Sequence, residues 1–257
     1  SPSQFDITII GKEPYPNYNR IMLSNILQKK MTVEDTIMNP YDWYQENNIE
    51  LINNDPVEKV DKENKIVTTS KGIEVEYDIC IFATGSKAFV LPIPGSNLPS
   101  VIGWRTIDDT NKMIEIAQTK KRAVVIGGGL LGLECARGLL DQGMEVTVLH
   151  LADWLMEMQL DRKAGEMLKA DLEKQGMKIE LQANSKEIIG DKDVEAIKLA
   201  DGRVIETDLV VMAVGIRPYT EVAKDSGLDV NRGIVVNDYM QTSDSHIYAV
   251  GECAEHD

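Results

Sequence analysis

The sequence predicts an α/β protein that consists of two related units, each built on a largely parallel sheet. Strand-like apolar runs alternate with helical runs through most of the 257 residues, as expected for βαβ units. One pattern also occurs twice at the same spacing, as GIEVEYDICIFATG (Gly72–Gly85) and as GRVIETDLVVMAVG (Gly202–Gly215). Each copy has an aspartate, Asp78 or Asp208, directly before an apolar strand. Two copies of one fold are the simplest explanation of this repeat.

The clearest βαβ unit begins at Lys121. RAVVIG predicts a buried strand, LLGLECARGLLDQG a helix that ends at Gly143, and EVTVLH the next strand. A second helix is expected from about Asp161 to Lys174, ending at Gly176 and followed by the strand KIELQ. This alternation indicates neighbouring parallel strands that are connected by helices.

Composition and charge narrow the class of protein. Hydrophobic residues make up 43% and charged residues 27% of the chain, which is typical of a globular protein. The formal net charge of −15 argues against binding to nucleic acid or to an anionic membrane surface. No apolar run approaches the roughly 20 residues that a membrane-spanning helix needs. Cys80, Cys135 and Cys253 lack CxxC spacing, so we expect no disulfide framework, no metal site, and a reducing, cytoplasmic location.

The glycines between RAVVI and the following helix form a G-x-G-x-x-G pattern, in which Leu130 and Leu131 are the last variable positions. In such a loop Gly127 permits the tight turn, Gly129 lets a pyrophosphate approach the backbone, and Gly132 lets the helix pack closely on the strand. The phosphates then lie at the helix N-terminus, where free N–H groups favour anions even in an acidic chain. The pattern predicts a dinucleotide-binding site, and a glycine-rich turn without a ligand is the alternative.

The end of the strand EVTVLH bears on which dinucleotide is favoured. An acidic residue there accepts hydrogen bonds from the ribose 2′-OH of NADH, whereas a basic residue accommodates the 2′-phosphate of NADPH. This position holds His150, which indicates neither, and Asp153 is close enough in sequence to substitute. A surface histidine without a role is the alternative, so the choice between NADH and NADPH stays open.

The first strand-like run, FDITIIGKE, ends on the acidic residue Glu13 and matches the second strand of a dinucleotide-binding unit. No glycine fingerprint precedes it. The second copy places Gly127–Gly132 one helix ahead of its own second strand. We therefore expect the first copy to be truncated at its N-terminus, with its first strand and glycine loop missing.

Clusters of proline and glycine at Val90–Ser100 and Gly215–Tyr219 mark two crossings between the copies. We expect residues 1–103 and 219–257 to form one discontinuous domain and residues 104–218 to form a domain inserted into it. The predicted fold class is α/β, with two Rossmann-like, three-layer ββα dinucleotide-binding domains.

Several motifs together resemble one family. ATGS, GGGLLGLE, VGIRP and YAVGE resemble the pyridine-nucleotide FAD oxidoreductases, and the resemblance covers nearly the whole chain. Within that superfamily, EPYPNYNRIMLS, HLADWLMEMQLD and VGECAEH are most similar to the N-terminal flavin-reductase part of the large-subunit family of NAD(P)H-dependent nitrite reductases. The resemblance implies that the discontinuous domain binds FAD and that the inserted domain binds NAD(P)H.

The resemblance also implies roles for individual residues. Glu13 would bind the adenosine ribose of FAD, and Arg20 would reach its phosphates. Thr84 and Gly85 would line the turn beside the flavin. Glu134, inside the fingerprint helix, would face the contact between nicotinamide and flavin and is the catalytic candidate.

Related ferredoxin reductases pair the glutamate at this helix position with a lysine. The corresponding site here reads Ser24-Asn25, so that ion pair cannot form. The redox cysteines of the disulfide reductases are also missing, which excludes thiol–disulfide chemistry. Lys87 is expected to be a solvated surface lysine, and Arg217-Pro218 is either a cofactor contact or a turn between domains.

The segment TSDSHIYAVGECAEH (Thr242–His256) resembles the part of these reductases that closes the flavin site. The resemblance implies that Gly251 and Glu252 contact the ribityl or pyrophosphate region, and that Gly215 belongs to a cofactor-binding turn. Aspartate is usual at the position of Glu252, and glutamate keeps the carboxylate. A core strand with a polar end is the alternative.

The implied activity is transfer of a hydride from NAD(P)H to FAD, after which the flavin releases electrons singly. In the nitrite reductase family the acceptor is an iron–sulfur and sirohaem module that reduces nitrite to ammonia. Nothing in this chain can ligate either centre, so we expect that module outside it. The expected partners are NAD(P)H and downstream redox domains or a small electron-carrier protein, and a homodimer is left open. A stand-alone rubredoxin or ferredoxin reductase and a non-catalytic nucleotide-binding scaffold are the alternatives.

Overall fold

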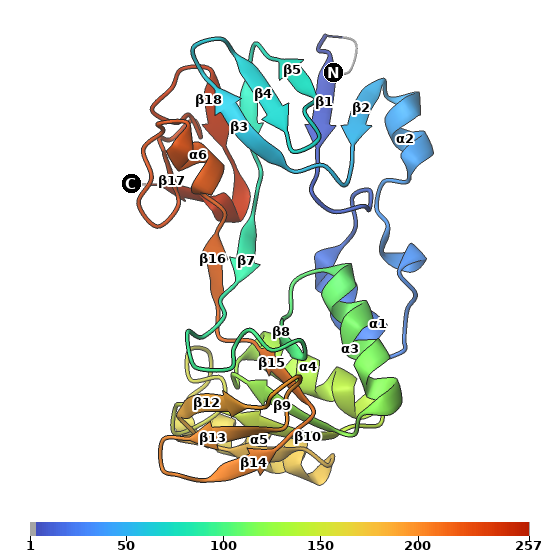
Figure 1. Cartoon of the computed structure of the whole chain (residues 1–257), viewed down its shortest axis with the longest axis vertical. Coiled ribbons are helices and arrows are strands. Elements are labelled where there is room, and N and C mark those ends of the chain that lie inside the picture. The colour runs from blue at the N-terminus through green and yellow to red at the C-terminus, as the bar shows by residue number, and fades with distance from the viewer. Residues whose placement is uncertain (1–3, 257) are drawn as a thin grey trace. The chain divides into compact units, whose positions relative to one another are not determined.

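A computed structural model describes residues 4–256 and divides them into two compact units (Figure 1). The first comprises the described residues of Ser1–Tyr18, Ile37–Lys87 and Ile216–Asp257. The second comprises Asn19–Thr36 and Ala88–Gly215. Both contain parallel strands, helices and an antiparallel three-stranded sheet, which confirms the predicted α/β class.

The second unit is built on a five-stranded parallel sheet in the order β11-β10-β9-β15-β8. These strands are Lys178–Glu180, Glu145–Leu149, Arg122–Ile126, Leu209–Met212 and Val101–Gly103. The main helices are α3 (Ile107–Thr119), α4 (Leu130–Asp141) and α5 (Arg162–Lys174). The order β9-α4-β10-α5-β11 is the βαβ series that the sequence predicts from Lys121 onward.

A second sheet covers one face of this parallel sheet. The antiparallel strands β12 (Ser185–Ile189), β13 (Ala196–Leu199) and β14 (Val204–Glu206) pack on it through one apolar cluster. That cluster joins Ile188 and Ile197 to Val124 and Val210 of the parallel sheet. Helix α4 packs on β9 and β10, so the layers are sheet, sheet and helix, as the ββα prediction requires.

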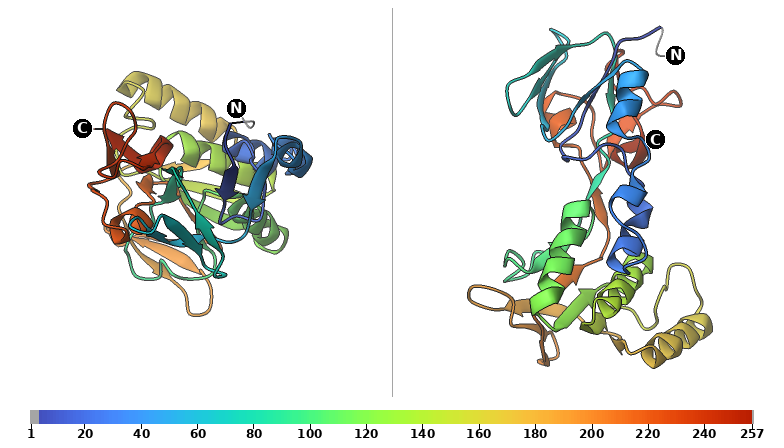
Figure 2. Two further views of the ribbon diagram at one scale, coloured as in Figure 1. Left: turned by 90° about the horizontal axis from the view of Figure 1, so that it is seen from above. Right: turned by 90° about the vertical axis from the view of Figure 1, so that its right-hand side faces the viewer.

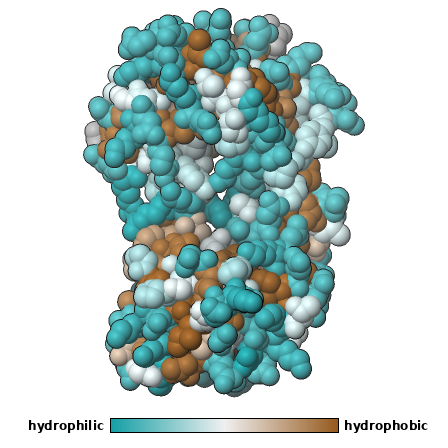
Figure 3. Space-filling view, in the orientation of Figure 1, coloured by the Kyte–Doolittle hydropathy of each residue, from teal (hydrophilic) through white to brown (hydrophobic). Residues whose placement is uncertain are grey.

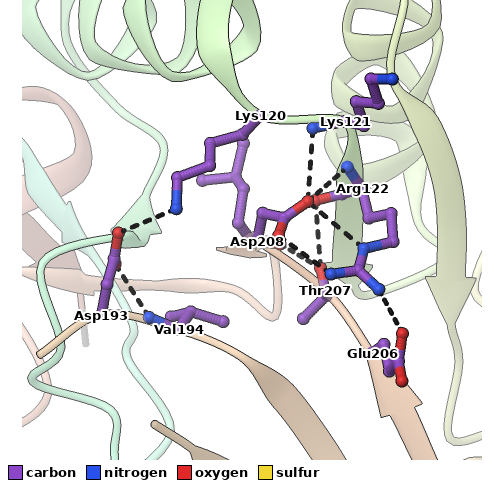
Figure 4. A network of polar contacts seen from close by, with 9 residues as sticks. Lys120, Lys121, Arg122, Asp193, Val194, Glu206, Thr207 and Asp208 are labelled. Carbon is purple, nitrogen blue, oxygen red and sulfur yellow. Dashed lines mark hydrogen bonds and ion pairs between the residues drawn. The ribbon is translucent and has the colours of Figure 1, made fainter. Parts of the chain in front are cut away.

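A polar network fixes the start of β15 to the start of β9 (Figure 4). The Asp208 carboxylate accepts hydrogen bonds from the Arg122 backbone N–H (2.9 Å) and from Nη2 of the Arg122 guanidinium (3.1 Å). Lys121 N–H also donates to it at 3.3 Å. The Arg122 guanidinium beside Asp208 holds the pKa of that carboxyl below its ordinary value of 3.8. The aspartate of the second repeat therefore aligns two neighbouring parallel strands.

The first unit contains the corresponding elements in a divided form. Its parallel strand pairs are β1 (Ile7–Ile10) with β2 (Ile49–Ile52), β6 (Cys80–Phe82) with β18 (Ile247–Ala249), and β17 (Ile234–Val236) with β19 (Ala254–His256). An antiparallel sheet, β3-β4-β5, precedes β6 as β12-β13-β14 precedes β15. The remaining elements are α2 (Tyr41–Glu46), β3 (Val57–Asp61), β4 (Ile66–Thr69), β5 (Glu74–Glu76), β7 (Ser86–Ala88), β16 (Ile216–Pro218) and α6 (Glu221–Asp225).

Within residues 4–256, β1 and β6 each pair with one strand, whereas β10 and β15 of the second unit flank β9 on both sides. The unpaired edge leaves apolar side chains uncovered. Ile79 and Ile81 are 51% and 59% exposed, while their repeat counterparts Leu209 and Val211 are 0% exposed. On the face drawn in Figure 3, apolar residues lie among hydrophilic ones. The described part of the first unit thus lacks a counterpart of β9.

Three stretches differ from the predicted domain boundaries, and one of them, residues 216–218, packs with the first unit rather than the second. Residues 19–36 and 88–103 pack with the second unit rather than the first. Helix α1 (Leu23–Leu27) contacts α4 and α3, and the views in Figure 2 show it (blue) beside α3 (green). The reason is burial of Leu27, which is fully enclosed and lies against Gly138 of α4. In the part of the chain that the structure describes, no helix is long and apolar enough to cross a membrane.

Candidate dinucleotide-binding site

The glycine loop connects β9 to α4 at the carboxyl edge of the parallel sheet. Strand β9 ends at Ile126 and α4 begins at Leu130, with Gly129 as its N-cap. The Gly127 N–H donates to the Leu149 carbonyl of β10 at 2.8 Å, which holds the loop between neighbouring strands. This is the strand, turn and helix that the fingerprint requires.

The three fingerprint glycines differ in what a side chain would meet. Gly127 has φ +119°, and a Cβ there would lie 2.3 Å from the Ala213 carbonyl oxygen. A Cβ on Gly132 would lie 2.0 Å from the Gly127 carbonyl oxygen. A Cβ on Gly129 would meet no atom within 4 Å. Gly127 and Gly132 therefore serve close packing, while Gly129 faces open space of the kind a pyrophosphate needs, so the loop fits a dinucleotide.

The N-terminus of α4 is open toward that space. No side chain caps it, and the Leu130 and Leu131 side chains are both exposed. The first N–H groups of a helix have no partner within the helix, and its dipole favours negative charge. The residues predicted to bind the phosphates, Gly127, Gly129, Leu130, Leu131 and Gly132, thus lie together on one loop and helix end.

His150 follows β10 and lies under the glycine loop, so the surface alternative is wrong. Its side chain is only 8% exposed. The Gly128 backbone N–H donates to Nδ1 at 3.0 Å, and Nε2 lies 2.9 Å from Oε2 of Glu157. Because Nδ1 accepts a hydrogen bond, the ring proton is assigned to Nε2, which donates to Glu157.

Sequence reasoning missed Gly128. A Cβ there would lie 2.8 Å from Cγ of His150 and 2.6 Å from Cδ2 of Leu155. Its carbonyl also accepts a hydrogen bond from the Met156 N–H at 3.1 Å. Gly128, a variable position of the pattern, is thus contacted by His150 and Leu155 and hydrogen-bonded by Met156. A bulky apolar residue some five positions past the end of the strand is the only sequence signal for this contact.

Asp153, the predicted substitute for a ribose acid, is engaged elsewhere. It accepts hydrogen bonds from Nη2 of Arg162 at 3.0 Å and from Nε2 of Gln182 at 2.6 Å. The Gln182 and Arg162 hydrogen bonds lower the pKa of its carboxyl. Asp153 therefore links the loop after β10 to the start of α5.

Glu134 lies on α4 beyond the glycine loop, half-buried. Ser24 and Asn25 lie on α1, which packs against the same helix. Their side chains bond within their own segment, Ser24 to the Ile21 carbonyl and Asn25 to the Met22 sulfur. No ion pair to Glu134 is formed by the described residues, and its catalytic role stays a prediction.

In the first unit, Glu13 lies just after β1. Its Oε2 accepts a hydrogen bond from the Tyr18 hydroxyl at 2.7 Å, which orients the carboxylate. The neighbouring Lys12 donates to the Tyr219 hydroxyl, and its ammonium lies 4.0 Å from the centre of that ring. Lys87 pairs with Glu221, so it is not simply a solvated lysine.

The two ends of the first unit's sequence meet through backbone and side-chain contacts. Gly85, with φ +64°, accepts a hydrogen bond from the Tyr219 N–H at 2.9 Å, and Thr84 donates to the Tyr219 carbonyl at 2.9 Å. The buried Ser86 hydroxyl donates to Glu252 at 2.6 Å, and Gly251 has φ +77°. The motifs ATGS and YAVGE are therefore adjacent, and Ser86 is a partner that sequence reasoning missed.

Two other predicted cofactor residues, Arg20 and Gly215, belong to the second unit. Arg20 belongs to the second unit, in a short 3-10 helix (Arg20–Met22), and its guanidinium donates to the Arg105 carbonyl. Gly215, with φ +115°, ends the second unit and accepts a hydrogen bond from the Phe89 N–H. Their roles toward a cofactor stay predictions.

The three cysteines are free thiols in packed surroundings. Burial raises the pKa of the Cys80 thiol to about 11 and that of Cys135 further. The Cys253 thiol is fully buried and points to the Phe82 and Val250 carbonyls. Reactive cysteines have lowered pKa values, so the raised pKa values of Cys80 and Cys135 indicate packing roles. Within residues 4–256 no cluster of three or more metal-ligating side chains is found.

The residues of the first unit fit FAD only in part. An oriented carboxylate at Glu13 and the adjoining turns at Gly85 and Gly251 are present. Its described residues contain no glycine-rich loop at a helix N-terminus, which is the element predicted to bind the pyrophosphate in the second unit. The structure therefore supports a complete dinucleotide site in the second unit and a partial one in the first.

Two dinucleotide-type units, interleaved along the chain and with one intact fingerprint, define a class, the two-domain nucleotide-dependent oxidoreductases. The family model described as pyridine nucleotide-disulphide oxidoreductase matches residues 2–257, and the chain belongs to that family. It is 56% identical over 98% of its length to a nitrite reductase [NAD(P)H] of Bacillus subtilis and 44% identical over 98% to an assimilatory nitrate reductase electron transfer subunit of the same organism. It covers 31% and 33% of those proteins, about a third of their length.

A solved structure shares the fold over most of the chain. The ferredoxin reductase for the CYP199A2 system from Rhodopseudomonas palustris superposes with a TM-score of 0.90 at 31% identity, covering 97% of this chain and 62% of that protein. The chain is thus an oxidoreductase-family protein whose fold and motifs agree with the expected resemblance.

Proposed function

We propose that this chain is the electron-input part of a larger reductase, which takes a hydride from NAD(P)H and passes electrons through FAD toward the reduction of nitrite to ammonia. The nucleotide would bind the second unit at Gly127–Gly132, and FAD would bind the first unit at Glu13, Gly85 and Glu252. The observation that carries the proposal is the open space at Gly129 beside the uncapped N-terminus of α4.

The chemistry of the transfer belongs to the cofactors, since nicotinamide donates a hydride and flavin converts the electron pair into single electrons. The chain's own residues bind and orient. Gly127 and Gly132 set the loop geometry, the α4 N-terminus neutralises phosphate charge, and the buried His150 holds the loop in place. No protein acid or base is needed for hydride transfer, which agrees with the absence of a matching set in the sequence.

Nitrite is favoured as the final substrate because of the similarity to the nitrite reductase of B. subtilis. An iron–sulfur and sirohaem module would lie outside this chain. Transfer to a small carrier protein is the second candidate, favoured by the similarity to a ferredoxin reductase. Three free cysteines fit a reducing compartment, and we propose a cytoplasmic location. The homodimer stays a prediction.

The substitution Gly129→Ala tests the nucleotide site. Gly129 has φ −84° and an added Cβ meets no atom, so the variant should unfold at the same temperature as the wild type. The methyl group should occupy the phosphate position and weaken NADH binding by about tenfold or more, roughly 1.4 kcal/mol. Nicotinamide fluorescence titration of the purified chain measures this. Thr119→Ala, at the exposed end of α3, is the control.

Undiminished NADH affinity in Gly129→Ala would contradict the proposed site. Failure of the wild-type chain to bind either NADH or NADPH would contradict the electron-input function as a whole.

A further inference from the structure

We infer that Glu157 makes the site prefer NADH over NADPH. It would supply the ribose-binding carboxylate, since the usual position of that carboxylate holds His150. The inference rests on the proposed function and names a residue outside the fingerprint. Its basis is a relay of hydrogen bonds from the glycine loop through His150 to Glu157.

The relay begins at Gly128. In dinucleotide sites the residue after the second strand lies under the glycine loop and presents a carboxylate to the ribose. Here the Gly128 N–H donates to Nδ1 of His150 at 3.0 Å, so the imidazole takes up the loop contact. Its far nitrogen, Nε2, then donates to Oε2 of Glu157 at 2.9 Å. Both ring nitrogens are thus engaged. Nε2 donates its proton to Glu157, so it cannot accept a hydrogen bond from a ribose hydroxyl.

The backbone holds Glu157 at the same loop. The Met156 N–H donates to the Gly128 carbonyl at 3.1 Å, and the fully buried Leu155 side chain packs where a Gly128 side chain would lie. Glu157 is therefore fixed at the rim of the glycine loop through its neighbours and through its own carboxylate.

The Glu157 carboxylate is accessible to a ligand at the loop. Its side chain is 36% exposed, so a ligand at the loop can reach it. Among the described residues 4–256 the Glu157 carboxylate contacts only the imidazole, through Oε2, which leaves Oε1 available to a hydroxyl. A carboxylate accepts hydrogen bonds from a ribose 2′-OH and repels a 2′-phosphate, so the site should favour NADH.

Two other charged side chains near the loop, Arg162 and Asp153, are already engaged in contacts of their own. Arg162, the cation of the following helix, pairs with Asp153 at 3.0 Å and lies 4.8 Å from the Trp154 ring centre. Asp153 in turn also binds Gln182. Arg162, which could attract a 2′-phosphate, and Asp153, the alternative acid, therefore each have more polar partners than Glu157.

The test is direct binding, which needs no catalytic turnover. NADH and NADPH are titrated separately into the purified chain, and dissociation constants are taken from nicotinamide fluorescence. We expect the wild type to bind NADH at least tenfold more tightly than NADPH. In Glu157→Gln that ratio should fall at least fivefold, through weaker NADH binding and stronger NADPH binding.

Two matched variants separate a specific effect of Glu157 from the general effect of removing one negative charge. Glu166→Gln removes the same charge from the exposed face of α5 and should leave the ratio within twofold of the wild type. Asp153→Asn tests the other acid and should also leave the ratio unchanged. A ratio that responds to Asp153→Asn but not to Glu157→Gln overturns the assignment, as does a wild type that prefers NADPH.

The two levels of the proposal fail differently. If the wild type binds both dinucleotides with a ratio that Glu157→Gln does not change, only the role of Glu157 is wrong. If the wild type binds neither, the proposed nucleotide site is wrong and the role of Glu157 with it. Circular dichroism of each variant confirms that the exposed substitutions leave the fold intact.

Discussion

At the scale of single residues, the same residue type has different tasks in the two copies of the repeat. Asp208 ties β15 to β9 through the Lys121 and Arg122 backbone, while for its counterpart Asp78 no side-chain hydrogen bond is found within residues 4–256. The sequence repeat predicts equivalent positions, and only the structure shows that one of the two aspartates has a neighbouring strand to hold.

Asp208→Ala should lower the free energy of unfolding by about 1–3 kcal/mol, because backbone N–H groups of a buried strand lose a charged acceptor. The folded-state pKa of Asp208 is lowered, so its contribution is complete above the unfolded value and is lost as the pH falls through the folded value. The difference from wild type should be full above roughly pH 5 and shrink below about 3.8. Urea unfolding at several pH values measures it.

Asp78→Ala is the matched control, and its unfolding free energy should stay within about 0.5 kcal/mol of the wild type. Equal destabilisation by the two substitutions, or a difference that does not shrink as the pH falls below about 3.8, would contradict the role given to Asp208.

At the scale of elements, the helices and strands from Lys121 to Glu180 are those that the sequence predicts. Helix α5 begins after the N-cap Asp161, whose side chain accepts from the Ala164 N–H, and ends at Lys174 as expected from the glycine that follows. Local signals suffice there because caps and apolar periodicity act within a few residues. The assignment of α1 to the second unit has no local signal, since it depends on the contact of Leu27 with Gly138.

Leu27→Ala should destabilise the second unit by about 2–5 kcal/mol, since the removed side chain is fully buried against α4. Hydrogen exchange should speed up in α1 and in the face of α4 that it covers. Ile21→Ala, at an 80% exposed position two turns earlier, should change the stability by less than about 0.5 kcal/mol. Protection of α4 that survives Leu27→Ala would show that α1 does not dock there.

At the scale of the whole molecule, the two units are unequal copies. The second has a continuous parallel sheet, a glycine loop and a helix N-terminus aimed at the ligand space. The described part of the first has three separate parallel strand pairs, and Ile79 and Ile81 are exposed there although their repeat counterparts in the second unit are buried. NAD(P)H binding to the second unit and FAD binding to the first unit should therefore be separable in this chain.

The purified 257-residue chain should bind NADH detectably but hold FAD weakly or not at all. The physical reason is that the first unit's described residues offer the flavin an acid and two turns without backbone N–H groups for the pyrophosphate. The flavin absorbance of the protein peak after gel filtration in excess FAD measures retention, and NADH titration of the same sample is the control. A yellow peak with near-stoichiometric flavin would contradict this prediction.

The sequence by itself determined the α/β class, the repeat, the glycine fingerprint and the family, because each depends on residue types at fixed spacing along the chain. The tertiary structure alone decided what His150 does, since its partners Gly128 and Glu157 come from a different loop and from beyond the strand end. It also decided that Asp153 is occupied and that Ser86 holds Glu252. Side-chain partners of this kind are set by which strands are neighbours in the sheet, and spacing along one chain does not encode that neighbourhood.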